Sequence, residues 1–278
     1  MRVGVVQSWL GSRYLSFWKA YLQALGVEVV YPKTGPKLPL PPPIQQVVSE
    51  VLSLKNEPVD YLLLPDVQLG VEAQRGTPPL WLVDLAASLD QLISGLPPAL
   101  VVPAELSPEV VGLAAQIGQS LVKNPMLVRR ALERTKGYLA PSYKAPLQAG
   151  THLVGLIAQP MLTQEGEWLQ TLRTGLEAQG LSLFLADRPP AELRQEGAHL
   201  GLGLELPTDL EAAGMHRYLL RLGKVQALLY VHDPEYLPLP APLRRALRKT
   251  PPSKPWRMVG LEADWSRVGL ELSRGRAG

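Results

Sequence analysis

The chain of 278 residues contains no cysteine. Disulfides, zinc fingers, cysteine-ligated iron–sulfur centres and thiol nucleophiles are therefore excluded. A lack of cysteine is typical of a reducing compartment. No stretch reaches the roughly 20 consecutive apolar residues of a membrane-spanning helix. The apolar segment 1–7 is too short for a signal peptide, so we expect a cytoplasmic protein with no membrane association.

Charged and aromatic residues are also few, at 19% and 6% of the chain, and the net charge is only +3. So small an excess disfavours nucleic acid as a partner. Hydrophobic residues make up 46%, which allows a sizeable core, and the length predicts about two domains. The 28 prolines are about twice the usual share. Proline restricts the unfolded chain, so together with the lack of cysteine it favours a thermophilic source.

The first thirty residues follow a strand–helix–strand pattern. The run 3–6 predicts a buried strand, and apolar residues at spacings of three and four predict a helix from Ser12 to Leu25. Gly26 suits the end of that helix, and 27–31 reads as the next strand. Such crossovers imply a parallel sheet. Further elements are expected in order: helix 44–54, strand 61–64, helix 80–93, strand 99–102, a helix starting at 107–109 and a helix 125–138.

The pattern starts again after an aperiodic stretch, so we predict an α/β protein of two Rossmann/flavodoxin-like lobes, each a parallel sheet flanked by helices. The boundaries are 1–140 for the N-terminal domain, 141–150 for a linker and 151–278 for the C-terminal domain. The elements expected in the second domain are strand 153–157, helix 168–178, strand 181–185, a weak strand 200–204, helix 209–222, strand 225–231 and strand 257–261.

Ligands of open parallel sheets bind outside the carboxyl ends of the strands. This rule selects four loops, which begin at Gln7, Asp66, Gln159 and His232. The candidate ligand-binding residues are Gln7, Ser8, Arg13, Tyr14, Asp66, Gln68, His232, Asp233 and Glu235. No catalytic or metal-ligating residue and no cofactor is predicted.

Each candidate loop has a functional and a structural interpretation. The loop after the first strand enters a helix whose free N–H groups suit an anion, with Arg13 and Tyr14 nearby. It lacks the G-x-G-x-x-G spacing of dinucleotide sites, and a serine-capped helix start is the favoured interpretation. His232, Asp233 and Glu235 suit acid–base chemistry or a weak metal site. Neighbouring residues of an extended chain point apart, however, which favours a solvated turn.

The end of the chain, from Arg244 onward, is basic. Nine lysines and arginines stand there against Glu262, Asp264 and Glu271. This excess suits nucleic acid, an anionic ligand or an acidic partner, and a solvated helix face with a frayed tail is the favoured interpretation.

Segments along nearly the whole chain resemble, in order, the pattern of a known family. They are 1–5, Arg13-Tyr14, 17–19, 25–30, 59–65, 117–125 with Ala131, 224–230 and 268–274. The chain resembles the 2-hydroxyacyl-CoA dehydratase-like proteins associated with CoA-enzyme activases. The resemblance implies the two-lobed fold, and in full members an iron–sulfur cluster served by an ATP-driven electron activator.

The departures from that family pattern fall where the cluster would be held. His232 and Gly76 stand near expected cysteine positions, the proline-rich 38–43 replaces another, and Gln7 replaces an arginine. Iron–sulfur centres need thiolates, so the redox activity is not carried over.

Three functional hypotheses remain open. The preferred one is a non-catalytic relative without the cluster, which binds a protein partner or a small anionic, CoA-like ligand. The second is an enzyme that uses metal-independent acid–base or hydrolytic chemistry in a cleft between the lobes. The third is a nucleic-acid or acidic-protein binder that works through the basic C-terminal segment. The oligomeric state is left open.

Overall fold

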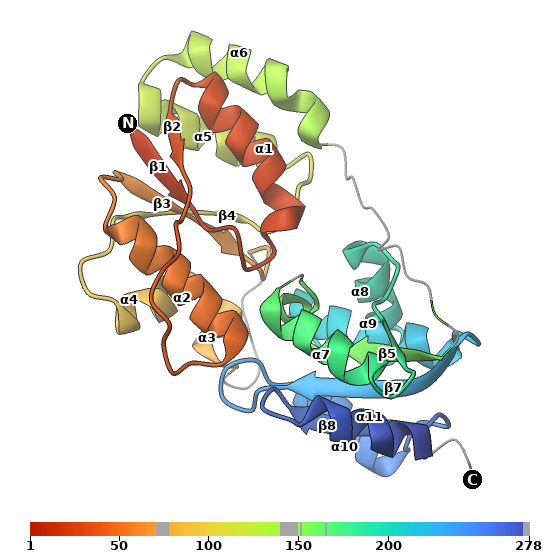
Figure 1. Ribbon diagram of the computed structural model, residues 1–278. Coiled ribbons are helices and arrows are strands. Elements are labelled where there is room, and N and C mark those ends of the chain that lie inside the picture. Colours follow the sequence, from red (N-terminus) through yellow and green to blue (C-terminus); the bar gives the residue numbers. More distant parts are fainter. Residues whose placement is uncertain (71–77, 140–149, 151, 165, 275–278) are drawn as a thin grey trace. The chain divides into compact units, whose positions relative to one another are not determined.

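The protein is an α/β protein with two four-stranded parallel sheets, each flanked by helices, as the sequence predicts (Figure 1). The computed structural model describes residues 1–70, 78–139, 150, 152–164 and 166–274. Two compact units divide the chain. Unit 1 holds the described residues of Met1–Gly70 and Leu80–Ser142, and unit 2 those of Val71–Pro79 and Tyr143–Gly278.

Unit 1 is built on a sheet of order β2-β1-β3-β4. Its strands are β1 (Arg2–Val5), β2 (Glu28–Val30), β3 (Tyr61–Asp66) and β4 (Ala99–Pro103). Its helices are α1 (Gly11–Ala24), α2 (Pro42–Lys55), α3 (Leu80–Val83), α4 (Leu85–Leu92), α5 (Val110–Val122) and α6 (Pro125–Thr135), followed by the 3₁₀ helix η1 (Lys136–Leu139). Helices α1, α5 and α6 lie on one side of this sheet and α2–α4 on the other (Figure 1).

Helix α1 supplies much of the core of unit 1 because its aromatic residues recur on one face. Phe17, Trp18 and Tyr21 are fully buried and contact one another through their rings. The hydroxyl of Tyr21 donates to the carbonyl oxygen of Ala114 in α5 at 2.6 Å, so the polar end of this side chain is satisfied inside the core.

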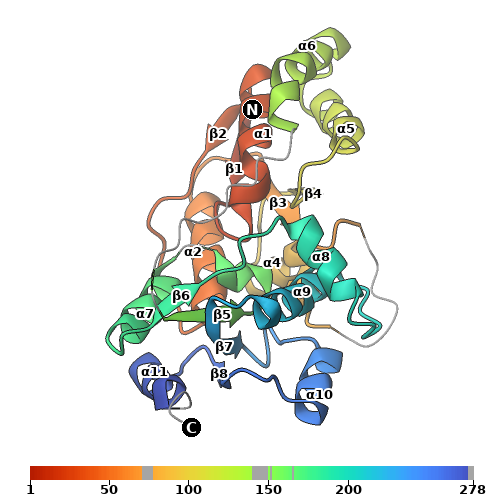
Figure 2. The ribbon, with the colours of Figure 1, turned by 90° about the vertical axis from the view of Figure 1, so that its right-hand side faces the viewer.

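Unit 2 repeats the same strand order as β6-β5-β7-β8. Its strands are β5 (Leu153–Ile157), β6 (Ser182–Phe184), β7 (Val225–His232) and β8 (Trp256–Gly260). Its helices are α7 (Glu167–Glu177), α8 (Pro190–Ala198), α9 (Pro207–Arg221), α10 (Ala241–Lys249) and α11 (Trp265–Arg274), with the 3₁₀ helix η2 (Pro160–Thr163). Helices α7 and α11 cover one face of the sheet, and α8, α9 and α10 cover the other (Figure 2).

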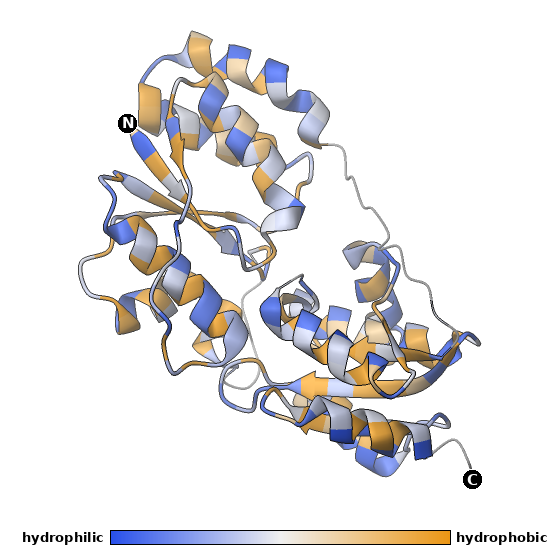
Figure 3. Ribbon diagram, viewed as in Figure 1, coloured by the Kyte–Doolittle hydropathy of each residue, from blue (hydrophilic) through white to orange (hydrophobic). Residues whose placement is uncertain are grey.

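The central strands of unit 2 are continuous apolar runs because both faces are covered by helices. All five residues of β5 are buried, and β7 is buried except at Gln226 and at its last residue, His232. Both strands are mostly orange in the hydropathy colouring of Figure 3. This pattern is typical of a parallel sheet with helices on both sides.

Helices α8 and α9 cross at two glycines. A Cβ atom on Gly214 would lie 1.8 Å from the carbonyl oxygen of Leu193, and one on Gly197 would lie 2.0 Å from that of Leu210. The backbones therefore meet where no side chain fits.

The structure differs from the sequence-based expectation in several elements. The predicted strand 200–204 is a loop with Gly201 and Gly203 at φ 62° and 64°. The predicted helix 80–93 is divided at Asp84, whose carboxylate caps α4 through the N–H of Ala87 at 2.9 Å. The helix expected at Ser107 begins at Val110. Helix α11 replaces the expected frayed tail.

Two predictions fall outside the described residues, namely the linker over 141–149 and the family departure at Gly76. Within the described part of the chain, no helix combines the length and the apolar character needed to cross a bilayer.

In each unit the chain leaves its first strand in one direction along the sheet and later returns in the other. The carboxyl ends of β1 and β3, and those of β5 and β7, therefore form the switch points where ligands of such folds bind.

Candidate functional site

The loop after β1 binds a carboxylate of its own unit. The N–H groups of Gln7 and Ser8 donate to Oε2 of Glu50 in α2 at 2.8 and 3.0 Å, and the Ser8 hydroxyl donates to the same oxygen at 3.0 Å. Burial raises the pKa of Glu50, and the hydrogen bonds from Ser8 and Gln7 oppose that rise. The donors that the sequence offers to an anionic ligand are therefore occupied by Glu50.

The same loop turns sharply through two buried residues. Trp9 and Leu10 have φ angles of 58° and 67°, a conformation that non-glycine residues rarely adopt, and Leu10 provides no side-chain cap for α1. Arg13 forms an ion pair with Glu105 at 3.3 Å. Tyr14 is fully buried, where it donates to the carbonyl oxygen of Val6, and burial raises its pKa.

Asp66 and Gln68 after β3 hold their own turn. The carboxylate of Asp66 accepts from the N–H of Gln68 at 2.9 Å and from that of Gly70 at 2.6 Å. The buried amide of Gln68 donates to the carbonyl oxygen of Leu82. Thus all six candidates of unit 1 lie near the carboxyl edge of its sheet, but their polar groups mainly serve the fold.

Replacing Glu50 with alanine is expected to lower the stability of unit 1 by about 2 kcal/mol, because the N–H groups of Gln7 and Ser8 lose their acceptor in a half-buried loop. Urea denaturation followed by tryptophan fluorescence measures the change. The exposed Glu28→Ala is the control and is expected to change stability by less than about 0.5 kcal/mol. Equal stability of the two variants would contradict a structural role for Glu50.

In unit 2, Asp233 and Glu235 form a turn after β7. The N–H groups of Glu235 and Tyr236 donate to Oδ1 of Asp233 at 2.9 and 2.8 Å, and the backbones of Asp233 and Leu237 bond to each other in both directions at 3.2 Å. Glu235 is exposed. This geometry is that of the solvated turn favoured from the sequence, and it directs the chain back over the sheet edge at Pro238.

Gln159, directly beyond β5, is the most deeply buried polar residue at this edge, with 0% of its surface exposed. Its Nε2 donates to Oδ1 of Asp209 at 2.8 Å and to the carbonyl oxygen of Pro238 at 2.9 Å. Because both partners are acceptors, the orientation of the amide is fixed. The Oε1 atom is buried and has no hydrogen-bond partner among the described residues.

Asp209 lies in the first turn of α9. Burial raises its pKa to about 6, although the hydrogen bond from Gln159 lowers it. No lysine, arginine or histidine in the described ranges forms an ion pair with Asp209. The partial positive charge of the helix N-terminus favours the carboxylate, but no full counter-charge is present.

His232 and Arg244 lie on the same side of the edge. The Nδ1 of His232 and the Nε of Arg244 are buried and lack hydrogen-bond partners within the described chain. Burial lowers the pKa of His232, the Arg244 guanidinium lowers it further, and Asp233 opposes both. Arg244 stands in the second turn of α10 and pairs with no carboxylate of the described residues.

Gln159, Asp209, His232 and Arg244 together form what we call the unit 2 edge site. Strand β5 pairs with β7 through Ile157 and Tyr230, so Gln159 and His232 both stand two residues beyond that pair and on its face of the sheet. Gln159 donates a hydrogen bond to Asp209, and the Arg244 guanidinium is near enough to lower the pKa of His232. We therefore treat Asp209, Gln159, His232 and Arg244 as a row along the edge. The unpartnered buried side-chain atoms of unit 2, as far as it is described, are confined to this row.

Sequence reasoning selected the loop at Gln159 and the residue His232, but it missed Asp209 and Arg244. Asp209 follows Pro207, the first residue of α9, and Arg244 follows Pro240, the residue before α10. A proline at a helix start is the signal that places both residues near the carboxyl edge. The described residues contain no group of three histidine, cysteine, aspartate or glutamate side chains suited to a metal ion.

A depression in unit 2 lies between α7 and α11, on the face of the sheet opposite to α9 and α10. Its volume is about 630 Å³, and its lining includes Thr171, Thr174 and Trp265. It is open and holds none of the unpartnered groups, so the edge site is the stronger candidate.

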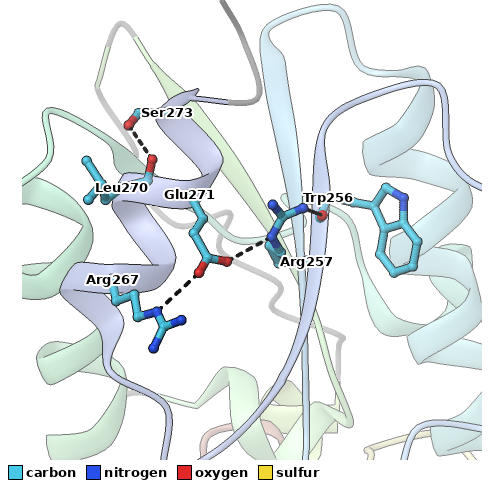
Figure 4. A network of polar contacts seen from close by, with 6 residues as sticks. All are labelled: Trp256, Arg257, Arg267, Leu270, Glu271 and Ser273. Carbon is cyan, nitrogen blue, oxygen red and sulfur yellow. Dashed lines mark hydrogen bonds and ion pairs between the residues drawn. The ribbon is translucent and has the colours of Figure 1, made fainter.

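The basic C-terminal segment is partly neutralised within unit 2 (Figure 4). Glu271 of α11 accepts from Arg257 of β8 at 3.0 Å and from Arg267 at 3.3 Å. Arg245, Arg248 and Lys249 of α10 remain exposed.

Comparisons with protein-family models, curated proteins and solved structures find no match to this chain.

Proposed function

We propose that this chain is a non-catalytic, cytoplasmic binding protein that takes a small anionic ligand at the unit 2 edge site. The observations that carry the proposal are the buried Nε of Arg244 and the buried Nδ1 of His232, neither of which has a hydrogen-bond partner among the described residues. The two side chains are near enough for the Arg244 charge to lower the pKa of His232. Unpaired buried polar groups cost free energy. An anion bound by Arg244 and by the His232 tautomer that is protonated at Nδ1 removes that cost.

The surroundings of Arg244 also favour an anion. The guanidinium carries parallel N–H groups that match a carboxylate or phosphate. The N-terminus of α10 faces the same edge, and its partial positive charge favours an anion, although Pro240 and Pro242 provide no N–H groups there. A switch point at the carboxyl ends of β5 and β7 is the usual ligand position of this architecture.

A binding role is favoured over catalysis by what surrounds His232. The carboxylate of Asp233 accepts from two N–H groups of its own turn, and Glu235 is exposed, so neither is poised with His232 for proton transfer. The resemblance to dehydratase-like proteins without the cluster cysteines supports the same conclusion, and it favours a ligand with the phosphates of coenzyme A.

Inorganic phosphate, acetate and coenzyme A are the probes that test the proposal. At constant ionic strength, we expect at least one of them to bind and Arg244→Gln to weaken its binding about tenfold or more, because a charge-assisted pair is lost. Titration calorimetry measures the dissociation constants. Arg245→Gln, an exposed neighbour on α10, removes the same charge and is expected to bind as the wild type does.

Equal losses in the Arg244 and Arg245 variants, both abolished by salt, would replace the edge site with the basic face of α10. That outcome would favour the nucleic-acid or acidic-protein hypothesis. Failure of all three probes to bind the wild type would contradict the proposal.

A further inference from the structure

We infer that the ligand of the unit 2 edge site is a zwitterion, whose protonated amine is held by Asp209 and Gln159 while its anionic group is held by Arg244 and His232. This inference rests on the proposed function, and it names the class of ligand for that site. The inference is carried by Asp209 and Gln159, whose acceptor oxygens an anion alone would leave without a donor.

One oxygen of the Asp209 carboxylate lacks a donor within the described chain. One of its oxygens accepts from Gln159, and the described residues provide the other with neither a hydrogen bond nor an ion pair. The side chain is half-buried, so water screens it only in part. A cation brought by a ligand is the partner that this carboxylate lacks.

Gln159 adds an acceptor oxygen, Oε1, whose orientation is fixed. Its Nε2 is held by two acceptors, so Oε1 must remain where it is, buried and without a partner. An ammonium group carries three donors and no acceptor. Asp209 and Oε1 of Gln159 together offer two acceptors to such a group, and they offer nothing to a second anion.

The charges of the row explain why one ligand must carry both signs. Asp209 and Arg244 carry opposite charges, and within the described chain neither forms an ion pair with the other or with any other residue. A ligand with only one charge would leave the other half-buried and unpaired, which is costly. An aminocarboxylate satisfies both ends.

The distance between the anion-binding and the amine-binding groups can be measured with a series of ω-amino acids of increasing chain length. The probes are glycine, β-alanine, 4-aminobutyrate and 5-aminopentanoate, each compared with acetate, propionate, butyrate or pentanoate of the same length. At pH 7.5, where Asp209 is ionised, we expect one amino acid to bind about tenfold more tightly than its amine-free counterpart. Chemical-shift titration of the full chain yields each dissociation constant.

Asp209→Asn keeps the shape of the side chain and removes its charge. We expect this variant to lose the tenfold advantage of the amino acid and to keep the affinity of the amine-free carboxylate. Glu192→Gln on the exposed surface of α8 is the control for net charge and should preserve both affinities.

Equal binding of amino acids and plain carboxylates by the wild type would overturn the zwitterion inference and leave the anionic site standing. Retention of the amine advantage in Asp209→Asn would also overturn it. If neither series binds, and phosphate and coenzyme A do not bind either, both the inference and the proposed function fail.

Discussion

Gly214→Ala is expected to lower the free energy of unfolding of unit 2 by about 3 kcal/mol, the upper range for overpacking in a closed interface. The three atoms nearest to the new Cβ all belong to the backbone of Leu193, at 1.8, 2.6 and 3.0 Å. A side chain could rotate away, but a backbone carbonyl moves only with its helix. Helices α8 and α9 must therefore separate, which opens the core beneath them.

Gly223→Ala is the matched control in the same unit, because a Cβ atom there meets nothing within 4 Å. We expect it to change stability by less than about 0.5 kcal/mol. Urea denaturation followed by far-ultraviolet circular dichroism compares the two variants. A Gly214 variant as stable as the Gly223 variant would show that the crossing of α8 and α9 is looser than described.

Asp209→Asn is expected to stabilise the protein at pH 8 by up to about 3 kcal/mol. The pKa of Asp209 rises from 3.8 to about 6 on folding, and a difference of this size corresponds to about 3 kcal/mol. The folded state holds the proton more tightly than the unfolded state. The stability that Asp209 contributes is therefore complete below about pH 4 and is lost as the pH rises through 6.

Asparagine has no proton to lose in this range, and its oxygen still accepts from Gln159. The difference in unfolding free energy between variant and wild type should therefore grow from pH 4 to pH 7 and then level off. Denaturant titrations at half-unit pH intervals trace this curve. A difference that does not depend on pH would show that the ionised carboxylate is well solvated.

The two expectations for Asp209→Asn point in opposite directions, and this makes them informative together. If the variant gains stability and loses amine binding, Asp209 has a binding role and not a structural one. Substitution of a structural residue would lower both stability and binding. Residues that serve a site commonly cost the fold some stability.

The fold could be predicted where the spacing of hydrophobic residues along the sequence distinguishes strands from helices. The run Leu153–Ile157 is apolar throughout because helices cover both faces of its sheet, and the structure has a strand with these bounds. Helix α8 was missed because its buried residues are only Leu193 and Gly197, too few to show a period. In α11 the buried Trp265, Val268 and Leu272 do show helical spacing, but the surrounding charges favoured a tail.

The candidate site could be predicted only in part. The strand-end rule finds His232 and the loop at Gln159 because it depends on local pattern alone. It cannot show that Asp209, fifty residues after Gln159, reaches that amide, since this follows from how α9 packs on the sheet. In the same way, Asp66 and Asp233 are conspicuous in the sequence, yet each carboxylate is engaged by N–H groups of its own turn.

Glu50 gives the two units different sensitivities to their surroundings. A tethered carboxylate competes with dissolved anions at a very high effective concentration. Phosphate and metabolite pools in a cell would therefore have to displace a group that never diffuses away from Gln7 and Ser8. The loop after β1 is thus insulated from changes in the concentration of dissolved anions, whereas the unit 2 edge site has no such internal competitor among the described residues.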